Sequence, residues 1–302
     1  MEFSMPIRIR WDVDFKGRSG RAKRIARGIR EGAPMFVELR IEGEKGLSEV
    51  PAIFAELHQG DTRIEATVPL SPGAIRVARR GYPIDFLWEV GSREPFRRLL
   101  PPEADAISFV PDEDNLVFLP DVMEEFAESG IRTLHLPNIN AVRALALKGH
   151  VPIPTPDMIR EAVGRISSLG ISLGGKKLVV HDYFLWGILR DAFPGEVGGR
   201  LEFSGCQAAS ALAYVDWEGN VYPCDSLPIR LGNLHETAFE KIWSAPARSR
   251  ILDAIHAVPP VCGPCDQQKV CLSGCRGLAY LAAGTLDAPD PCCPEKTTPA
   301  LK

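Results

Sequence analysis

The distribution of cysteine constrains this chain more than any other feature. All eight cysteines of the 302 residues fall in the last third, and the first two-thirds contain none. The spacings Cys262-x2-Cys265-x5-Cys271-x3-Cys275 suit thiolates that converge on metal, and the remaining members are Cys206, Cys224, Cys292 and Cys293. We therefore expect a cysteine-free part followed by a part whose order depends on metal-thiolate bonds.

Composition indicates an ordinary soluble protein. Hydrophobic residues make up 45% of the chain, charged residues 25%, and the net charge is -4, so nucleic acid is not an expected partner. The N-terminus is charged where a signal peptide would be apolar, and no apolar run reaches membrane-spanning length, so we predict no membrane partner and a cytoplasmic location. Thiols stay reduced there, which favours metal or redox chemistry over disulfides.

Up to about residue 195, short β-rich runs alternate with amphipathic helical patterns. The predicted strands are Ile7–Val13, Met35–Ile41, Thr62–Val68, Ile84–Val90, Ala106–Val110, Ile131–Leu136 and Lys177–His181. Predicted helices include 47–58, 118–129, 156–169 and 183–193. Such alternation predicts an α/β fold with a parallel sheet, either open or closed into a barrel.

Active groups of parallel α/β folds gather at the carboxyl ends of the strands. Here these ends carry Asp12, Asp14, Glu42, Glu44, Asn138, Asn140, His181 and Asp182. Two interpretations apply to Asp12, Asp14, Glu42 and Glu44. They form either a degenerate cofactor site or a set of loop acids exposed to water, and exposure is the favoured interpretation. For His181 and Asp182 the favoured interpretation is likewise structural, because no second histidine or cysteine pattern supports a site.

The last third follows a different pattern. Ala211–Trp217 and Val221–Pro223 predict two strands of a hairpin, joined by a turn in which Gly219 supplies a positive φ. A helix containing Phe239, Ile242 and Trp243 is expected to pack on this module, and the four-cysteine run follows in irregular backbone. The boundary between the two parts falls near residues 194–204, where glycine and proline interrupt the periodicity.

The order Cys206-x12-Gly219-x4-Cys224, then Cys262-x2-Cys265-x5-Cys271-x3-Cys275, then Asp290-Pro291 and a cysteine, resembles the seven-cysteine signature of SPASM domains. These domains are the auxiliary-cluster modules of radical SAM peptide-modifying enzymes. The flanking Gly219-Asn220-Val221-Tyr222-Pro223-Cys224 and Leu231-Gly232-Asn233 match as well. The resemblance covers roughly residues 200–296 and implies two iron-sulfur clusters of the 4Fe-4S type.

Carried over to this sequence, the resemblance implies one cluster on Cys262, Cys265, Cys271 and a cysteine after Asp290-Pro291. Cys293 matches the family spacing better, and Cys292 is the alternative. The other cluster would take Cys206, Cys224 and Cys275. Its fourth ligand stays open, because the extra upstream cysteine of some members would fall at Arg200.

The front part resembles the radical SAM barrel more faintly. Ile41–Leu47 occupies the position of the family's Gly-Gly-Glu-Pro motif, but Asp12–Arg18 contains no cysteine where the family has its Cys-x3-Cys-x2-Cys loop. The resemblance therefore implies a degenerate radical SAM-like partial TIM barrel at 1–198 and a SPASM module at 199–302, with no functional SAM cluster. In this combination the chain resembles the family of SPASM-only proteins of the GeoRSP system.

This resemblance implies an accessory protein that is not an independent radical SAM enzyme. It would carry electrons to a partner radical SAM/SPASM enzyme, or present its substrate peptide. Two alternatives remain: an enzyme that uses an open auxiliary cluster or the barrel mouth, and a binding module stabilised by structural zinc.

A separate basic run has no acid within it and lies on a predicted helix. It is interpreted as a solvated face, with a partner-docking patch as the alternative. Its members are Lys16, Arg18, Arg21, Lys23, Arg24, Arg27 and Arg30.

Overall fold

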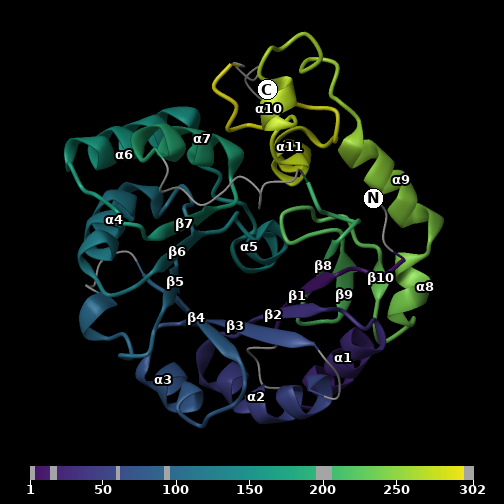
Figure 1. Ribbon diagram of the computed structural model, residues 1–302. Helices are drawn as coiled ribbons and strands as arrows, with labels where there is room; N and C mark the ends of the chain where they lie inside the picture. The colour runs from purple at the N-terminus through teal and green to yellow at the C-terminus, as the bar shows by residue number, and fades with distance from the viewer. Residues whose placement is uncertain (1–3, 14–18, 59–61, 92–95, 195–205, 296–302) are drawn as a thin grey trace. The chain divides into compact units, whose positions relative to one another are not determined.

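The computed structural model describes residues 4–13, 19–58, 62–91, 96–194 and 206–295 (Figure 1). The chain divides into two compact units, each made of two segments. The first comprises residues 1–89 and 207–253, and the second comprises residues 90–206 and 254–302. The predicted boundary near residue 198 separates two continuous stretches of sequence, whereas each of these units combines an early and a late segment of the chain. The predicted boundary therefore stays a prediction.

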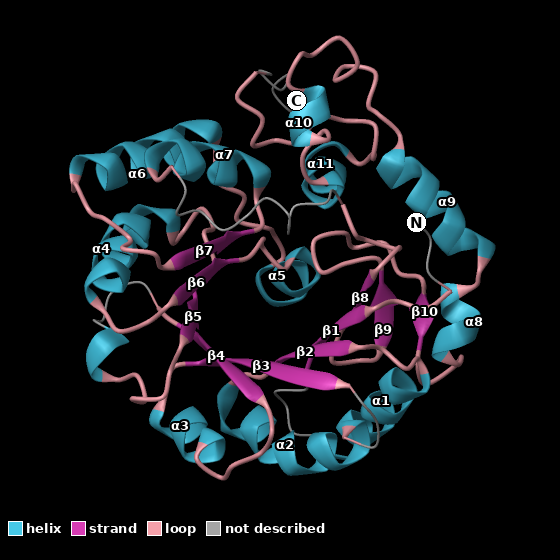
Figure 2. Ribbon diagram, viewed as in Figure 1, coloured by secondary structure: helices cyan, strands magenta, loops and turns pink. Residues whose placement is uncertain are grey.

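The first unit is built on four consecutive parallel strands. They are β1 (Arg8–Asp12), β2 (Phe36–Arg40), β3 (Arg63–Pro69) and β4 (Asp85–Glu89), paired in that order. The connections contain α1 (Ser19–Glu31), α2 (Gly43–Leu57) and α3 (Pro72–Ala78), which cover one face of these strands (Figure 2). Alternate strand residues such as Val37 and Leu39 are buried, as a sheet with one helix-covered face requires.

The cysteine-bearing segment extends the same sheet. Strand β8 (Leu212–Val215) pairs in parallel with β1, so that Arg8 lies opposite Leu212 and Trp11 opposite Val215. Antiparallel strands β9 (Asn220–Tyr222) and β10 (Gly232–Asn233) follow at the edge. Helices α8 (Phe239–Trp243) and α9 (Pro246–His256) come next in the sequence. The division between the two units falls within α9, after Asp253.

The second unit contains three parallel strands: β5 (Ala106–Ser108), β6 (Thr133–Leu136) and β7 (Lys177–Val180). Its helices are α4 (Leu119–Glu128), α5 (Ala141–Lys148), α6 (Pro156–Ser168) and α7 (Tyr183–Ala192), with short 3-10 turns at Phe96–Arg98 and Leu116–Phe118. The last segment carries α10 (Gln268–Cys271) and α11 (Arg276–Ala283).

These elements confirm the predicted α/β fold class with its mostly parallel sheet. Each of the seven strands predicted in the front part is present within two residues of its expected ends. The four predicted helices are present as well, three of them within one residue of their expected ends, while α2 begins four residues before the predicted residue 47. Helices α3, α5 and α11 were not predicted, because each has only seven or eight residues and therefore few repeats of an amphipathic pattern. Within the described residues, no helix is long and apolar enough to cross a membrane.

Helix α1 carries the described part of the basic run and has a clear buried face. Ala22, Ile25, Ala26 and Ile29 are almost fully buried, whereas Lys23, Arg24 and Arg27 are exposed. Arg27 and Arg30 both form ion pairs with Glu56 of α2. This arrangement favours the solvated-face interpretation, while Lys16 and Arg18 lie outside the described residues.

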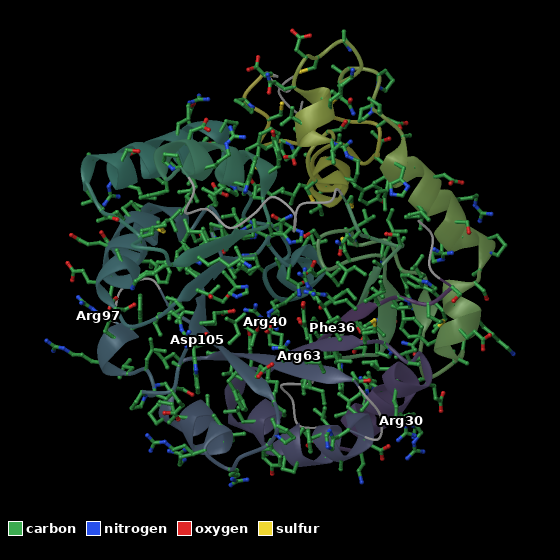
Figure 3. All side chains as sticks on the ribbon, viewed as in Figure 1. Arg30, Phe36, Arg40, Arg63, Arg97 and Asp105 are labelled. Carbon is green, nitrogen blue, oxygen red and sulfur yellow. The ribbon has the colours of Figure 1, made fainter. Side chains whose placement is uncertain are left out.

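A row of charged residues crosses the sheet of the first unit on the face opposite the buried positions. Arg10 lies opposite Glu38, Glu38 opposite Glu65, and Glu65 opposite Asp85. Arg10 forms an ion pair with Glu38, and Arg63 forms one with Asp85. Glu65 lies between two acids, and burial together with the Glu38 charge raises its pKa to about 7. Figure 3 labels Phe36, Arg40 and Arg63 on β2 and β3.

The Glu65 pKa predicts a specific pH dependence of stability. The ordinary pKa of a glutamate side chain is 4.5. Between pH 4.5 and about pH 7, Glu65 is therefore ionised in the unfolded chain but still protonated in the folded chain. Stability therefore falls as pH rises through this window. We expect Glu65→Gln to be more stable than the parent near pH 8, on the order of 2 kcal/mol, and equal to it near pH 4.

Urea unfolding of both proteins at the two pH values measures this effect. Glu31→Gln, at an exposed site of α1, is the matched control and should leave the profile unchanged. Parallel pH profiles for the parent and Glu65→Gln would contradict the prediction.

Candidate metal centre

The β8–β9 hairpin that precedes Cys224 is held by one carboxylate. Asp216 accepts hydrogen bonds from the backbone amides of Glu218 and Asn220, at 2.8 and 2.9 Å, and from the Asn220 side chain at 2.8 Å. Tyr222 donates its hydroxyl proton to the same carboxylate at 3.1 Å. Gly219 adopts φ +80°, as predicted, and an added Cβ would lie 3.3 Å from the His235 ring. This turn fixes the strand that leads into Cys224.

The Leu231-Gly232-Asn233 segment braces the same turn. Asn233 donates from its side-chain amide to the Glu218 carbonyl at 3.1 Å and to the Asn220 side-chain oxygen at 2.9 Å. A Cβ on Gly232 would lie 2.8 Å from the Ile242 side chain, so only glycine allows α8 to pack this closely. Residues that the family pattern singles out therefore act as supports for the cysteine rather than as ligands.

Cys224 is buried at the end of this hairpin, and its backbone pairs with Leu227. The neighbouring Asp225 forms an ion pair with Arg10 of β1 at 3.1 Å. The pKa of Arg10 is raised by the charges of Asp225 and Glu38, and to a smaller extent by a charge on the Cys224 thiol, although burial opposes the shift. A cationic group thus lies within electrostatic range of this thiol.

Four thiols interact with one another in the loop 262–293 of the second unit. Burial raises the pKa of Cys271, and charges on Cys262 and Cys265 raise it further. Burial likewise raises the pKa of Cys293, and charges on Cys271 and Cys262 add to the effect. The predicted set Cys262, Cys265, Cys271 and Cys293 is therefore brought within electrostatic range. Iron would lower these pKa values, because the ligand form is the thiolate.

Across the described residues, no group of three or more Cys, His, Asp or Glu side chains surrounds a single metal-ion position. Ligands of an iron-sulfur cluster bind different iron atoms, so they do not surround one ion. The chemistry of the four thiols fits such a cluster, since cysteine thiolates are its usual ligands. The assignment of the individual ligands stays a prediction.

Asp290 connects the middle of this loop to its end. It is 3% exposed, and its carboxylate accepts hydrogen bonds from the backbone amides of Cys275, at 2.6 Å, and Cys292, at 2.8 Å. Gly274 has φ +69°, and an added Cβ would lie 2.5 Å from the Asp290 carboxylate. Burial raises the pKa of Asp290 to about 7, and the charge of Asp182 adds to the shift. Asp290 thus links Cys275, a predicted ligand of one cluster, to the segment that carries Cys292 and Cys293.

The adjacent cysteines after Pro291 have different surroundings. Cys292 is 2% exposed, and its thiol lies 3.5 Å from the Pro154 carbonyl, to which it donates. Burial raises its pKa, and the charges of Asp182 and Asp290 add to the effect. Cys293 instead interacts with Cys271 and Cys262. This difference favours Cys293 as the cluster ligand, in agreement with the family spacing.

Cys275 occupies the N-cap position of α11. Burial raises its pKa, the charges of Asp290 and Cys206 add to the shift, and the amides of Gly277 and Leu278 oppose it. Cys206 and Cys275 belong to the second unit and Cys224 to the first, so the set Cys206, Cys224 and Cys275 stays a prediction.

Polar residues at the strand ends act mainly as helix caps. Asn140 accepts from the Arg143 amide at 2.9 Å to begin α5, and Asp182 accepts from the Leu185 amide at 2.8 Å to begin α7. Asn138 and Asp182 also line a small, mostly apolar pocket together with Cys292.

Of the remaining strand-end residues, Glu42 precedes α2 and pairs with Arg40 at 3.3 Å. Asp12 is not exposed, contrary to the favoured interpretation, since it is 2% exposed and lies opposite Arg40. Its charge contributes to the raised pKa of Arg40. His181 is exposed, whereas Asp14 and the side chain of Glu44 lie outside the described residues.

The hydrogen bonds of Asp290 predict how the loop responds to substitution. Asp290→Ala removes both acceptors and leaves two buried amides unpaired, at a cost of about 1–3 kcal/mol each. We expect limited proteolysis to cut within 259–293 while the rest of the chain resists. Asp287→Ala, in which an exposed acid of the same segment is removed, is the control and should behave like the parent. Equal cleavage of both variants would contradict this role.

Residues 206–266 match the family model of SPASM, described as an iron-sulfur cluster-binding domain. An AdoMet-dependent heme synthase of Methanosarcina barkeri is 36% identical over 89 residues, and one of Nitratidesulfovibrio vulgaris is 34% identical over 109 residues. The matches cover 30% and 35% of this chain, and only 25% and 29% of those proteins.

Among solved structures, native anSMEcpe with bound AdoMet superposes with a TM-score of 0.62 at 13% identity, covering 95% of this chain and 94% of that one. Native anSMEcpe with bound AdoMet and Cp18Cys peptide gives 0.60 at 14% identity, with the same coverage. At these identities the likeness establishes the fold alone, and it agrees with the radical SAM-like fold predicted for the front part. The match to the SPASM model of iron-sulfur cluster-binding domains is thus confined to residues 206–266 of this chain.

Proposed function

We propose that this chain is an iron-sulfur accessory protein that serves a partner radical SAM enzyme in peptide modification. It would bind two auxiliary 4Fe-4S clusters in the cytoplasm, and would pass electrons to the partner or present the substrate peptide to it. The observation that carries the proposal is the placement of every cysteine at or after Cys206, four of them within the residues that match the SPASM model, in a chain of radical SAM-like fold.

Two sets of residues support the two clusters. Cys262, Cys265, Cys271 and Cys293 would hold one, and their mutual electrostatic interactions agree with this set. The other would be held by Cys206, Cys224 and Cys275, which leaves one iron for a ligand of another kind. When bound, such clusters supply one-electron transfer. The chain itself provides the thiolates, excludes water by burial, and orients the loop through Asp290.

The sequence of the front part supports an accessory role, because it lacks the cysteines that SAM cleavage requires. The sequence Asp12–Arg18, which begins at the last residue of β1, contains no cysteine, whereas a radical SAM enzyme needs three thiolates after this strand. The heme synthases match only about a third of this chain, so their named activity is not extended to it. The structure of anSMEcpe with a bound peptide supports a peptide as the molecule presented, because that protein shares the fold.

Metal content tests the proposal directly. Protein purified without oxygen is expected to be brown and to contain iron and acid-labile sulfide, up to two clusters per chain. Cys271→Ala should lower both contents by about half and should expose 259–293 to proteolysis, because iron-thiolate bonds order this segment. Cys292→Ala, which removes a thiol bonded to a backbone carbonyl, is the matched control and should keep the iron. Stoichiometric zinc without sulfide would instead establish the zinc-stabilised module.

SAM cleavage separates the accessory role from the enzymatic alternative. With SAM and a strong reductant, the isolated chain is expected to produce no 5'-deoxyadenosine, because no thiolates hold a cluster after β1. Chromatography of the product mixture provides the measurement, with an active radical SAM enzyme as the positive control. Turnover that disappears in Cys224→Ala would show that the open auxiliary cluster is catalytic.

A further inference from the structure

Two buried hydrogen-bond donors lie unpaired beside the predicted cluster ligands. The Ser273 hydroxyl and the Arg276 Nε group have no hydrogen-bond partner among the described residues. Ser273 is 6% exposed and Arg276 is 1% exposed. Leaving such donors unsatisfied costs about 1–3 kcal/mol each, so their position calls for an acceptor.

The rest of the Arg276 guanidinium is firmly held by neutral acceptors. Its Nη1 atom donates to the carbonyls of Leu286, at 2.9 Å, and Ala288, at 2.7 Å, while Nη2 donates to the Ser273 carbonyl. A buried positive charge is costly unless a negative charge compensates it. Asp290 supplies a weak electrostatic partner, but burial and Asp182 favour the neutral form of that acid. A cluster with four thiolate ligands carries net negative charge and would provide the missing compensation.

The backbone between Cys271 and Cys275 is left-handed over three consecutive residues. Leu272, Ser273 and Gly274 adopt φ values of 51°, 67° and 69°, a left-handed conformation that costs roughly 1–2 kcal/mol for a residue with a side chain. The amide of Ser273 also lies at the Cys271 thiol, where it lowers the pKa and partly offsets the effect of burial. Ser273 therefore already supplies one polar group to a predicted ligand.

We propose that the Ser273 hydroxyl and the Arg276 Nε group donate hydrogen bonds to sulfur atoms of the cluster held by Cys262, Cys265, Cys271 and Cys293, and thereby raise its reduction potential. Hydrogen bonds to sulfur and nearby positive charge both stabilise the reduced, more negative cluster. The inference rests on the proposed cluster binding and adds the residues that set how readily this cluster accepts an electron.

Potentiometric titration of anaerobically loaded protein tests the proposal. Ser273→Ala and Arg276→Gln should each reduce the ratio of reduced to oxidised cluster about tenfold at a fixed ambient potential, which is a shift of roughly 59 mV to more negative values. Arg276→Lys keeps the charge but loses Nε, so its shift should be intermediate. The control Ser167→Ala, whose hydroxyl donates to the Val163 carbonyl in α6, should leave the potential unchanged.

Stability of the metal-free protein provides a second readout. Because the Ser273 hydroxyl has no hydrogen-bond partner among the described residues, Ser273→Ala removes a buried unpaired group and should unfold at a urea concentration equal to or higher than that of the parent when both lack iron. Arg276→Gln should be less stable, since three backbone carbonyls lose donors. If Arg276→Gln does not fold, Ser273→Ala decides the question.

Iron and sulfide analysis separates the two ways of failing. A full complement of iron and sulfide in Ser273→Ala with an unchanged potential would overturn this inference and leave the proposed function standing. A parent protein without iron and sulfide would overturn the proposed function and this inference with it.

Discussion

Parallel pairing of β1 with β8 is the interaction on which the first unit depends. The two strands are about 200 residues apart in the sequence, yet four residues of each lie opposite one another. On one side β1 continues into β2, β3 and β4, and on the other β8 continues into the cysteine hairpin. The front segment and the SPASM hairpin therefore share one set of backbone hydrogen bonds, so Cys224 is carried by the same sheet as the predicted barrel strands.

A second constraint is the cost of burying charge and thiol groups. In the second unit Asp290, Arg276 and Cys292 are all at most 3% exposed. Asp290 is satisfied by backbone amides, Arg276 largely by backbone carbonyls, and Cys292 by one carbonyl. Backbone groups thus hold these side chains in a segment that contains the short helices α10 and α11 and no described strand.

Much of the fold could be predicted because its pattern is local. Strand-helix alternation located the seven front strands, and Gly219 located the hairpin turn. The cysteine spacing likewise identified the SPASM domain, and the choice of Cys293 over Cys292 agrees with their surroundings. Prediction failed where the partner is distant in sequence: Asp12 was expected to be exposed, but it is buried opposite Arg40 of β2. The favoured structural interpretation of Asp182 agrees with its role as a helix cap, for which the partner amide is only three residues away.

The sequence by itself determined the α/β class, the cysteine-free front part and the SPASM module, because periodicity and ligand spacing are properties of neighbouring residues. Only the tertiary structure decided that β8 joins β1, that Asp290 links Cys275 to Cys292, and that Ser273 and Arg276 are buried with donors unpaired. The physical reason is that burial and hydrogen-bond satisfaction depend on which distant segments pack together, and a linear pattern of residue types does not specify that packing.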